Sequence, residues 1–481
     1  MTKLTAISTA ILIATTCFSP LASAQQVPGT MKEAIERAVL QNPEVKLRFH
    51  NLEAAKAERG VAQGAWLPRI DLEVAAGVYE TKSPALASTV GYNGNRATLQ
   101  LRQTLFDGFA TLHETRRLSY AQQAAYFDLL SASNQTALDA ARAYTDVLRY
   151  RELVQLAADN FTTHQEVHDR LNQKVTAGVG RKVDMEQASG RMALAESNWI
   201  TESSNLHDVS ARYQRLIGGL PAKNLAAADS LGGFVKAGAG FSFESIRTNP
   251  DFLSAVASIR GYRSDAAVRR AAYSPTVELR ARQSIETNQS GINGDYRDTA
   301  LEVVLSYNLY RGGSDTARVN QYAAKLNSAY DLRDKACRDV WQTGAIAFND
   351  SQRLTAQIKL LAQHELSTSK ARQAYQQQFD IGQRSLLDLL DTENELYQAR
   401  RALANAEYDL RLSSVRVLAT SGTLLNALKL QTLSPDVPND SENAEADDAL
   451  MVCDSQIPTV STLDRTFDSR PTPLPAEPVK R

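Results

Sequence analysis

The chain has 481 residues, a formal net charge of -1 at pH 7 and 7% aromatic residues. This near-neutral balance gives no electrostatic attraction to nucleic acid, so we expect no nucleic-acid partner. Ala, Gln, Leu, Arg and Glu are abundant, a usage typical of long helices packed through small side chains rather than of an ordinary globular domain.

The first residues have the pattern of a cleaved secretory signal. Lys3 precedes an apolar stretch that runs to about Phe18, and Ala22-Ser23-Ala24 forms an A-x-A cleavage site. We predict a signal peptide over residues 1–24; an uncleaved anchor and a lipid on Cys17 are the alternatives. No later apolar run reaches the roughly 18 residues of a spanning helix, so none is predicted.

Two cysteines remain after this processing: Cys337 in a helical pattern and Cys453 in a polar tail. A disulfide between them is conceivable in an oxidising compartment, but no sequence feature supports it. We expect two isolated thiols.

The remainder of the chain consists of two similar halves. The matching landmarks are Asn42-Pro43 with Asn249-Pro250, Pro68 with Pro275, Gly178 with Gly382, and Asp184 with Asp388. Landmarks in the same order indicate one structural unit used twice. We predict a first repeat over residues 25–235, a second over 236–430, and a polar tail over 431–481 that is disordered or lies along the outside of the protein.

Each repeat begins with amphipathic helical segments and then switches to strands. Pro68 and Pro275 end the helices, because the residue before proline is driven towards extended geometry. Alternating apolar and polar residues then predict strand pairs over 69–80 and 96–107 and over 276–287 and 299–310. Each run is about ten residues, the length of a tilted strand that crosses a bilayer within a barrel, although a soluble hairpin would also alternate.

Aromatic residues mark the ends of these strands. Tyr79, Tyr307 and Tyr310 lie where the aromatic girdle of a membrane barrel would be.

A long helix follows each strand pair. Apolar residues at steps of three and four predict helices over 109–174 and 313–379, each roughly 100 Å long. After a tight turn, each long helix is followed by a return helix about half as long, over 183–217 and 386–420.

Four strands cannot close a barrel, because eight is the practical minimum. Left open, their edges would promote aggregation. Three chains would supply twelve strands and a closed pore, so we expect trimerisation.

With these landmarks the chain resembles the TolC-like outer-membrane efflux protein family, which includes the outer-membrane component of type I secretion. The resemblance rests on the Met31–Val39 entry pattern with Asn42-Pro43, the Leu67-Pro68 switch, the Leu105–Gly108 strand exit and the run Gly382–Asp391. It implies an α+β membrane protein: a homotrimer with a 12-stranded outer-membrane β-barrel, four strands per chain, continued by a long periplasmic α-helical barrel.

The resemblance also implies the function and the partners. Such trimers work with a periplasmic adaptor (membrane fusion) protein and an inner-membrane ABC transporter or RND pump, and they are embedded in outer-membrane lipid. The sequence of residues 105–118 is most similar to that of members that export proteins with ABC transporters, so we predict type I secretion of protein substrates. A multidrug efflux pump and, less favoured, a periplasmic coiled-coil adaptor are the alternatives.

The resemblance places a gate at the periplasmic tip, where the turns contain Gly178, Gly180 and Gly382. Arg384 and Asp184 match a family ion pair that closes the tip. Phe379 stands where the family has a tyrosine, and a phenyl ring cannot donate the corresponding hydrogen bond.

Asp388 and Asp391 are three residues apart, on one face of the second return helix. In a trimer they would form an acidic ring around the pore that attracts cations. The alternative is a solvated helix face with acids placed near a helix N-terminus, where the dipole favours them.

His164 and His168, four residues apart, could share a metal, but their surroundings do not form an H-E-x-x-H motif. We expect an exposed helix face there and no metal, no cofactor and no enzymatic chemistry.

Overall fold

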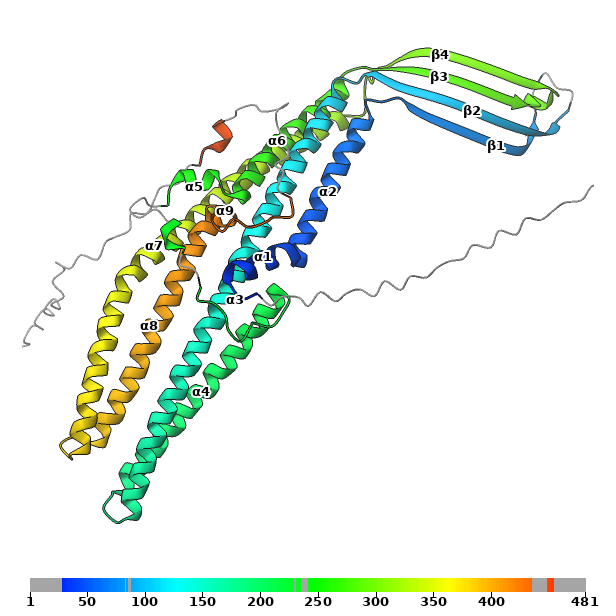
Figure 1. Ribbon diagram of the computed structural model, residues 1–481. Coiled ribbons are helices and arrows are strands. Elements are labelled where there is room, and N and C mark those ends of the chain that lie inside the picture. The colour runs from blue at the N-terminus through cyan, green and yellow to red at the C-terminus, as the bar shows by residue number, and fades with distance from the viewer. Residues whose placement is uncertain are drawn as a thin grey trace, which may run out of the picture.

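The computed structural model describes residues 28–82, 84, 88–228, 231–234, 241–434 and 448–453. These form a long stalk of helices with a four-stranded sheet at one end (Figure 1). The predicted signal peptide, residues 1–24, lies outside the described residues.

The sheet joins the two repeats edge to edge. Its antiparallel strands are β1 (Arg69–Thr81), β2 (Val90–Phe106), β3 (Thr276–Thr287) and β4 (Asp295–Ser306), in that order. Strand β2 pairs with β3, so that Arg96 lies opposite Glu286. The sheet is therefore one surface built from both halves of the chain.

Two strand predictions were wrong in their bounds. The strand predicted at 96–107 begins at Val90, and the one predicted at 299–310 lies at Asp295–Ser306. Glycines and polar residues fill these extra strand ends, and an apolar alternation cannot detect them. In β2 the Tyr79 ring covers the glycine backbone, since a Cβ on Gly94 would lie 3.1 Å from it.

One face of the sheet is apolar and open. Ile70, Leu72 and Val74 on β1 are largely exposed, as are Leu301 and Val303 on β4. The register aligns Ile70 with Leu101, Leu101 with Ala281, and Ala281 with Leu301, so this face continues across all four strands.

Tyr79 lies near the end of β1, as expected, but not on the apolar face that a girdle would occupy. It lies on the opposite, polar face of the sheet, where its ring stacks on Tyr92 with centroids 5.5 Å apart. Tyr307 and Tyr310 follow β4 and are exposed.

The recurring Asn-Pro pairs are helix caps. Helix α1 (Met31–Gln41) is followed by α2 (Pro43–Gly64), and the Asn42 side chain accepts from the backbone N–H of Glu44 at 2.9 Å. In the second repeat, Asn249 accepts from the N–H of Asp251 at 2.8 Å and starts α6 (Pro250–Arg270). Asparagine satisfies a free N–H, and proline at the first helical position has none to satisfy.

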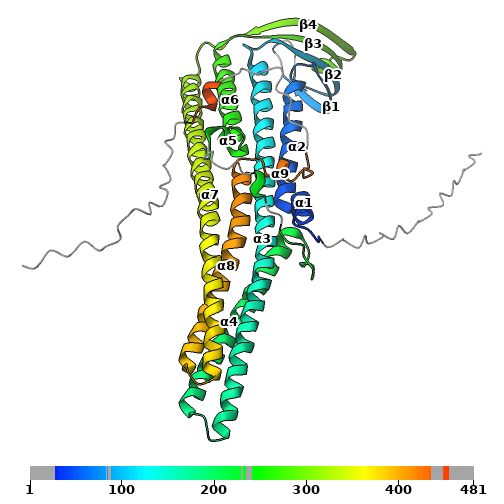
Figure 2. The same cartoon turned by 60° about the vertical axis from the view of Figure 1, so that its left-hand side comes forward.

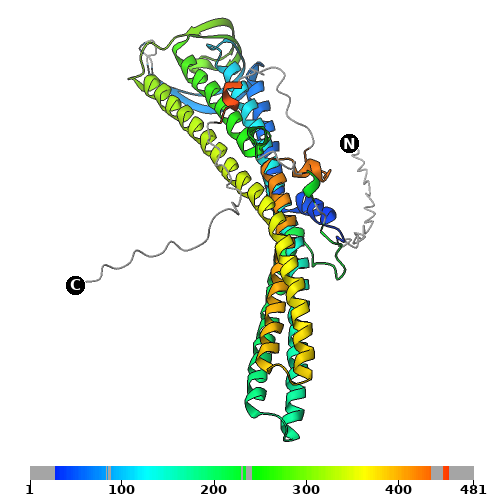
Figure 3. The same cartoon turned by 90° about the vertical axis from the view of Figure 1, so that its left-hand side faces the viewer.

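Two long helical hairpins form the rest of the stalk. They are α3 (Ala110–Thr176) with α4 (Lys182–Ile217), and α7 (Ser314–Asp380) with α8 (Leu386–Thr420). Figures 2 and 3 show the hairpins side by side, with the first reaching farther from the sheet than the second. Among the described helices, none combines the length and apolar character needed to cross a membrane.

Shorter elements lie beside the stalk. They are α5 (Phe243–Arg247), α9 (Leu424–Ala427) and the 3-10 turns η1 (Gly232–Phe234), η2 (Ala271–Tyr273), η3 (Gln289–Gly291) and η4 (Asp448–Met451).

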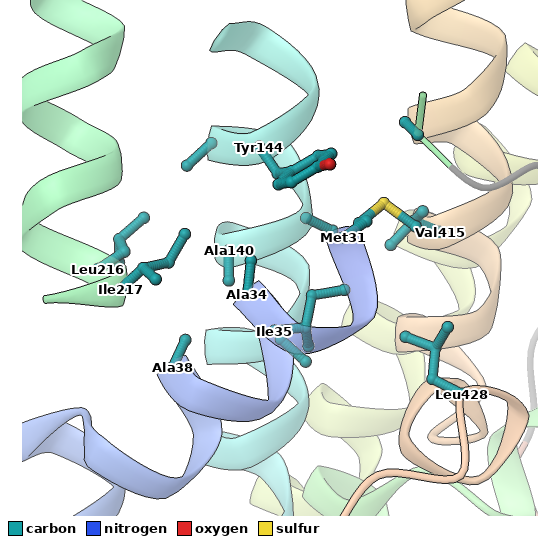
Figure 4. Packing of buried hydrophobic residues seen from close by; sticks show 14 of the residues in the cluster. Met31, Ala34, Ile35, Ala38, Ala140, Tyr144, Leu216, Ile217, Val415 and Leu428 are labelled. Atoms are coloured by element: carbon teal, nitrogen blue, oxygen red, sulfur yellow. The ribbon is translucent and has the colours of Figure 1, made fainter. Parts of the chain in front are cut away.

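The main core lies halfway along the stalk, where α1 packs across α3 and towards α8 (Figure 4). Ala34, Ile35 and Ala38 are fully buried against Ala140 and Tyr144. The Tyr144 hydroxyl donates to the carbonyl of Ala226 at 2.7 Å, which satisfies the polar end of a buried ring. Small alanines on both helices allow this close approach.

The cysteine prediction was wrong, and of the two alternatives for the tail, residues 448–453 follow the one in which it lies along the outside. Cys337 on α7 and Cys453 form a disulfide, with their Cα atoms 6.0 Å apart. Beside this bond, Leu450 is 2% exposed in a cluster with Phe241 and Trp341. Cysteine spacing in the sequence could not reveal the pair, because it depends on the packing of residues 448–453 beside α7.

We predict that the mature protein contains no free thiol when it is denatured without reductant. Cys453→Ser should expose one thiol, and the segment around Leu450, no longer tethered, should become cleavable by protease. Titration with a thiol reagent and limited proteolysis check both. Two free thiols in the unsubstituted protein would contradict the disulfide.

Candidate functional site: the paired hairpin tips

The first tip is a glycine turn between α3 and α4. Gly178 has φ of +76°, a conformation that suits glycine because it lacks a Cβ. A Cβ on Gly180 would lie 2.7 Å from the backbone nitrogen of Val175, so only glycine fits there. The N–H groups of Val179 and Gly180 both bond the carbonyl of Lys174, which closes the C-terminal end of α3.

The second tip repeats this design and adds a cap. Gly382 has φ of +77°, and the N–H of Gln383 bonds the carbonyl of Gln378 at 2.8 Å. Ser385 then starts α8 with a capping box: its hydroxyl accepts from the N–H of Asp388, and the Asp388 carboxylate accepts from the N–H of Ser385.

The ion pair expected between Arg384 and Asp184 is not formed within one chain. Arg384 donates to Gln378 Oε1 at 3.1 Å, lies 4.6 Å from the centre of the Tyr375 ring, and approaches Asp388 at 3.6 Å. All three partners belong to its own hairpin. Stacking on Tyr375 fixes the direction of the guanidinium, and sequence spacing cannot show such stacking.

Both carboxylates expected in an acidic ring already have partners. Asp388 caps α8, and the Ser385 hydrogen bonds together with the nearby Arg384 lower the pKa of its carboxyl. Asp391 forms an ion pair with Arg191 on α4, at 2.5 Å. The sequence prediction missed Arg191, because a partner on the other hairpin leaves no local signal.

Phe379 belongs to a small apolar cluster that joins the two hairpins near their tips. Leu386 and Leu390 of α8 pack there against Val167 and Leu171 of α3, with Ala188 of α4 and half-buried Phe379. Lys174 also lies over the Phe379 ring, 5.6 Å from its centre. Phe379 thus connects the hairpins by packing and by a cation–π contact.

Farther up the stalk, charged contacts connect α8 to the first hairpin. Arg401 pairs with Glu202, whose side chain is 3% exposed, and Arg149 pairs with Asp409, both at 2.5 Å. The Tyr408 hydroxyl donates to Glu152 at 2.9 Å; burial and this neighbouring carboxylate raise the Tyr408 pKa to about 12. Glu202 is buried, so removing Arg401 would leave its carboxylate unpaired away from water, and the pair therefore disfavours separation of the hairpins. Asp409 is about half exposed, so its pair contributes less.

The exposed face expected for the two histidines is wrong for one of them. His164 is buried beside α4, and burial, together with nearby Arg191, lowers its pKa. His168 is more exposed and lies 3.2 Å from Asp169. Across the described residues, no group of three or more His, Cys, Asp or Glu side chains is arranged to hold a metal ion.

An apolar-faced sheet that continues into paired helical hairpins with closed tips defines an outer-membrane channel subunit with a long helical extension. The sequence matches the family described as "Outer membrane efflux protein" over residues 34–219 and 244–423. The chain belongs to this family, whose members are channels of tripartite export systems. It is an outer-membrane protein with a large periplasmic part.

Three relatives show how widely the similarity extends. Outer membrane protein TolC of Escherichia coli K12 is 25% identical over 433 residues, covering 85% of this chain and 84% of TolC. Alkaline protease secretion protein AprF of Pseudomonas aeruginosa is 24% identical over 447 residues, covering 89% and 91%. Cation efflux system protein CusC of E. coli K12 is 21% identical over 414 residues, covering 82% and 87%.

A crystal structure of CusC has the same fold as this chain. The TM-score is 0.72 at 16% identity, and the match covers 81% of this chain and 91% of the solved one.

We predict that Leu390→Ala loosens the tip. Leu390 is fully buried between the hairpins, so its truncation should lower the free energy of unfolding by about 2–4 kcal/mol. Leu387→Ala, on the exposed side of the same helix, is the matched control and should cost less than about 1 kcal/mol. Denaturant unfolding in detergent measures both, and equal losses would contradict the packing role of the cluster.

We also predict a pH dependence from His164. Its folded-state pKa lies below the unfolded value of about 6.5, so the unfolded chain binds the proton more readily. The contribution of His164 to the free energy of unfolding should therefore be fully present above about pH 6.5 and decrease as the pH falls below that value. His164→Gln should reduce this decrease and His168→Gln should not, as measured by thermal unfolding between about pH 7 and pH 5; identical profiles for all three proteins would contradict it.

Proposed function

We propose that three copies of this chain form an export duct that conducts protein substrates of type I secretion across the periplasm and the outer membrane. The observation that carries the proposal is the sheet: one face is apolar and exposed, the other is charged, and the outer edges of β1 and β4 are unpaired in the described chain. Such a sheet suits a closed barrel with lipid outside and water inside.

Trimerisation is favoured by the number of strands. Two chains would supply eight strands, whose interior side chains fill the barrel, whereas three supply twelve and leave room for a channel. Closure would also pair β1 of one chain with β4 of the next, leaving no exposed edges.

In this assembly the tips of the second hairpins would surround the periplasmic opening. Asp388 and Asp391 remain partly exposed despite their partners, so their three copies would still favour cations. Opening would separate the hairpins at the Leu390 cluster and at the Arg191–Asp391 pair. Asp184 and Arg384 would complete the gate through contacts between neighbouring chains.

Protein secretion is favoured over drug efflux by two features. The sequence of residues 105–118 resembles that of members paired with ABC exporters, and AprF, similar over 89% of this chain, is named for secretion of an alkaline protease. The partners would then be a periplasmic adaptor and an inner-membrane ABC transporter. CusC, named for cation efflux, supports the alternative of an efflux pump with an RND partner.

The experiment that tests the duct is single-channel recording of the detergent-extracted protein in a planar bilayer, with its mass measured in parallel. A trimer with small, cation-selective steps supports the proposal. A monomer that needs no detergent and forms no channels would refute it. Deleting the gene then separates secretion from efflux. Loss of a secreted protein from the medium indicates secretion, and increased drug sensitivity of the deletion strain indicates efflux.

We predict that Arg191→Ala raises the single-channel conductance at least about twofold, because it removes the ion pair with Asp391. Arg170→Ala is the matched control: Arg170 is an exposed arginine whose partner Glu166 lies on its own helix.

Arg384→Ala and Asp184→Ala should also make the pore leakier, to ions in the bilayer and to large antibiotics in cells. Unchanged conductance in both variants would remove these two residues from the gate.

A further inference from the structure

The polar face of the sheet carries three arginines in one row. The register places Arg69 of β1 opposite Arg102 of β2, and Arg102 opposite Arg280 of β3. Neighbouring strands are about 4.8 Å apart, and like charges directly opposite one another are destabilising. We call Arg69, Arg102 and Arg280 the arginine row.

The row ends on a carboxylate, because the register places Glu302 of β4 opposite Arg280, and two further carboxylates lie beside it. Arg69 pairs with Asp71 at 3.0 Å and Arg280 with Glu278 at 2.7 Å. Arg102, between them, donates to the neutral amide oxygen of Gln100 at 3.1 Å and has no carboxylate partner within the described chain. Arg102 is therefore the arginine of the row whose exposed guanidinium is left for a carboxylate from outside this chain.

The row lies where the sheet meets the helices. Arg69 is the first residue of β1, directly after the α2 segment, and Arg102 is close to the end of β2 that leads into α3 (Figure 1). Farther along the strands the arginines of the polar face are paired across the sheet, Arg282 with Asp298 and Arg96 with Glu286. The arginine that lacks a carboxylate partner among the described residues of this face, Arg102, thus lies at the helix-side end of the sheet.

We propose that the arginine row is a transient binding site for the carboxylates of an acidic polypeptide passing through the duct. This rests on the proposed trimer, in which three copies of the row would surround the entrance of the barrel. The guanidinium group binds a carboxylate through two parallel hydrogen bonds, which suits it to this ligand.

The dimensions favour an extended polypeptide over a small anion. The three arginines span two strand spacings, about 10 Å. Alternate side chains of an extended chain lie about 7 Å apart on one side, so two carboxylates of one segment could contact the row together. A small anion could contact only part of it.

The test is block of the open channel in a planar bilayer by a soluble poly-L-glutamate oligomer, added to either side. The unsubstituted trimer should be blocked, with weaker block at high salt. Arg102→Gln should raise the half-blocking concentration about tenfold. Arg102→Lys keeps the charge but loses the two parallel N–H donors of the guanidinium, so its half-blocking concentration should lie between those of the unsubstituted and the Arg102→Gln channels. Arg69→Gln is a second variant in case Arg102→Gln does not assemble.

Arg297→Gln is the matched control, because Arg297 lies on β4 opposite Ile285, towards the other end of the sheet and on its other face. Block of equal strength in Arg102→Gln and the unsubstituted channel would overturn the proposal, as would equal weakening by Arg297→Gln. If sodium acetate blocks as well as the oligomer at equal carboxylate concentration, the site is one for small anions and the polypeptide assignment is wrong. If channels form but the oligomer does not block them, the binding role of the arginine row is wrong and the duct stands. If no channels form, both the duct and this binding role are wrong.

Discussion

The packing of α8 against both hairpins is the interaction on which the lower stalk depends. Near the tip its leucines contact α3 and α4 and Asp391 pairs with Arg191, while higher up its charged residues pair with Glu202 and Arg149. Toward its own hairpin, Glu393 pairs with Arg372 of α7. Because one helix holds neighbours on two sides, a shift of α8 would disturb the contacts of both hairpins.

The two repeats share a backbone plan but differ in side-chain role. Both start a helix with an Asn-Pro cap and turn at a glycine, so these residues recur. Of the two return helices, α8 starts with a serine–aspartate capping box, whereas α4 has Arg181 at its N-cap and no side-chain cap. The better-capped return helix is also the one that carries the contacts between hairpins, which is where a firm start matters most.

Local patterns in the sequence were enough to locate the helices. The four long helices begin and end within two residues of their predicted bounds, because caps, glycines and apolar spacing are local signals. The strand ends rich in Gly and Asn had no apolar alternation to reveal them. The direction of Arg384, the partner of Asp391 and the cysteine pair all depend on contacts between distant segments, and a single sequence does not contain them.

The disulfide has a mechanical consequence. It closes a covalent ring that contains the lower part of α7, the second tip and the whole of α8, between Cys337 and Cys453. However far the second tip moves, the two ends of the ring stay joined beside α6 and the upper part of α7 (Figure 2). The bond thus acts as a fixed point: the tip within the ring can move, whereas Cys337 and Cys453 cannot separate.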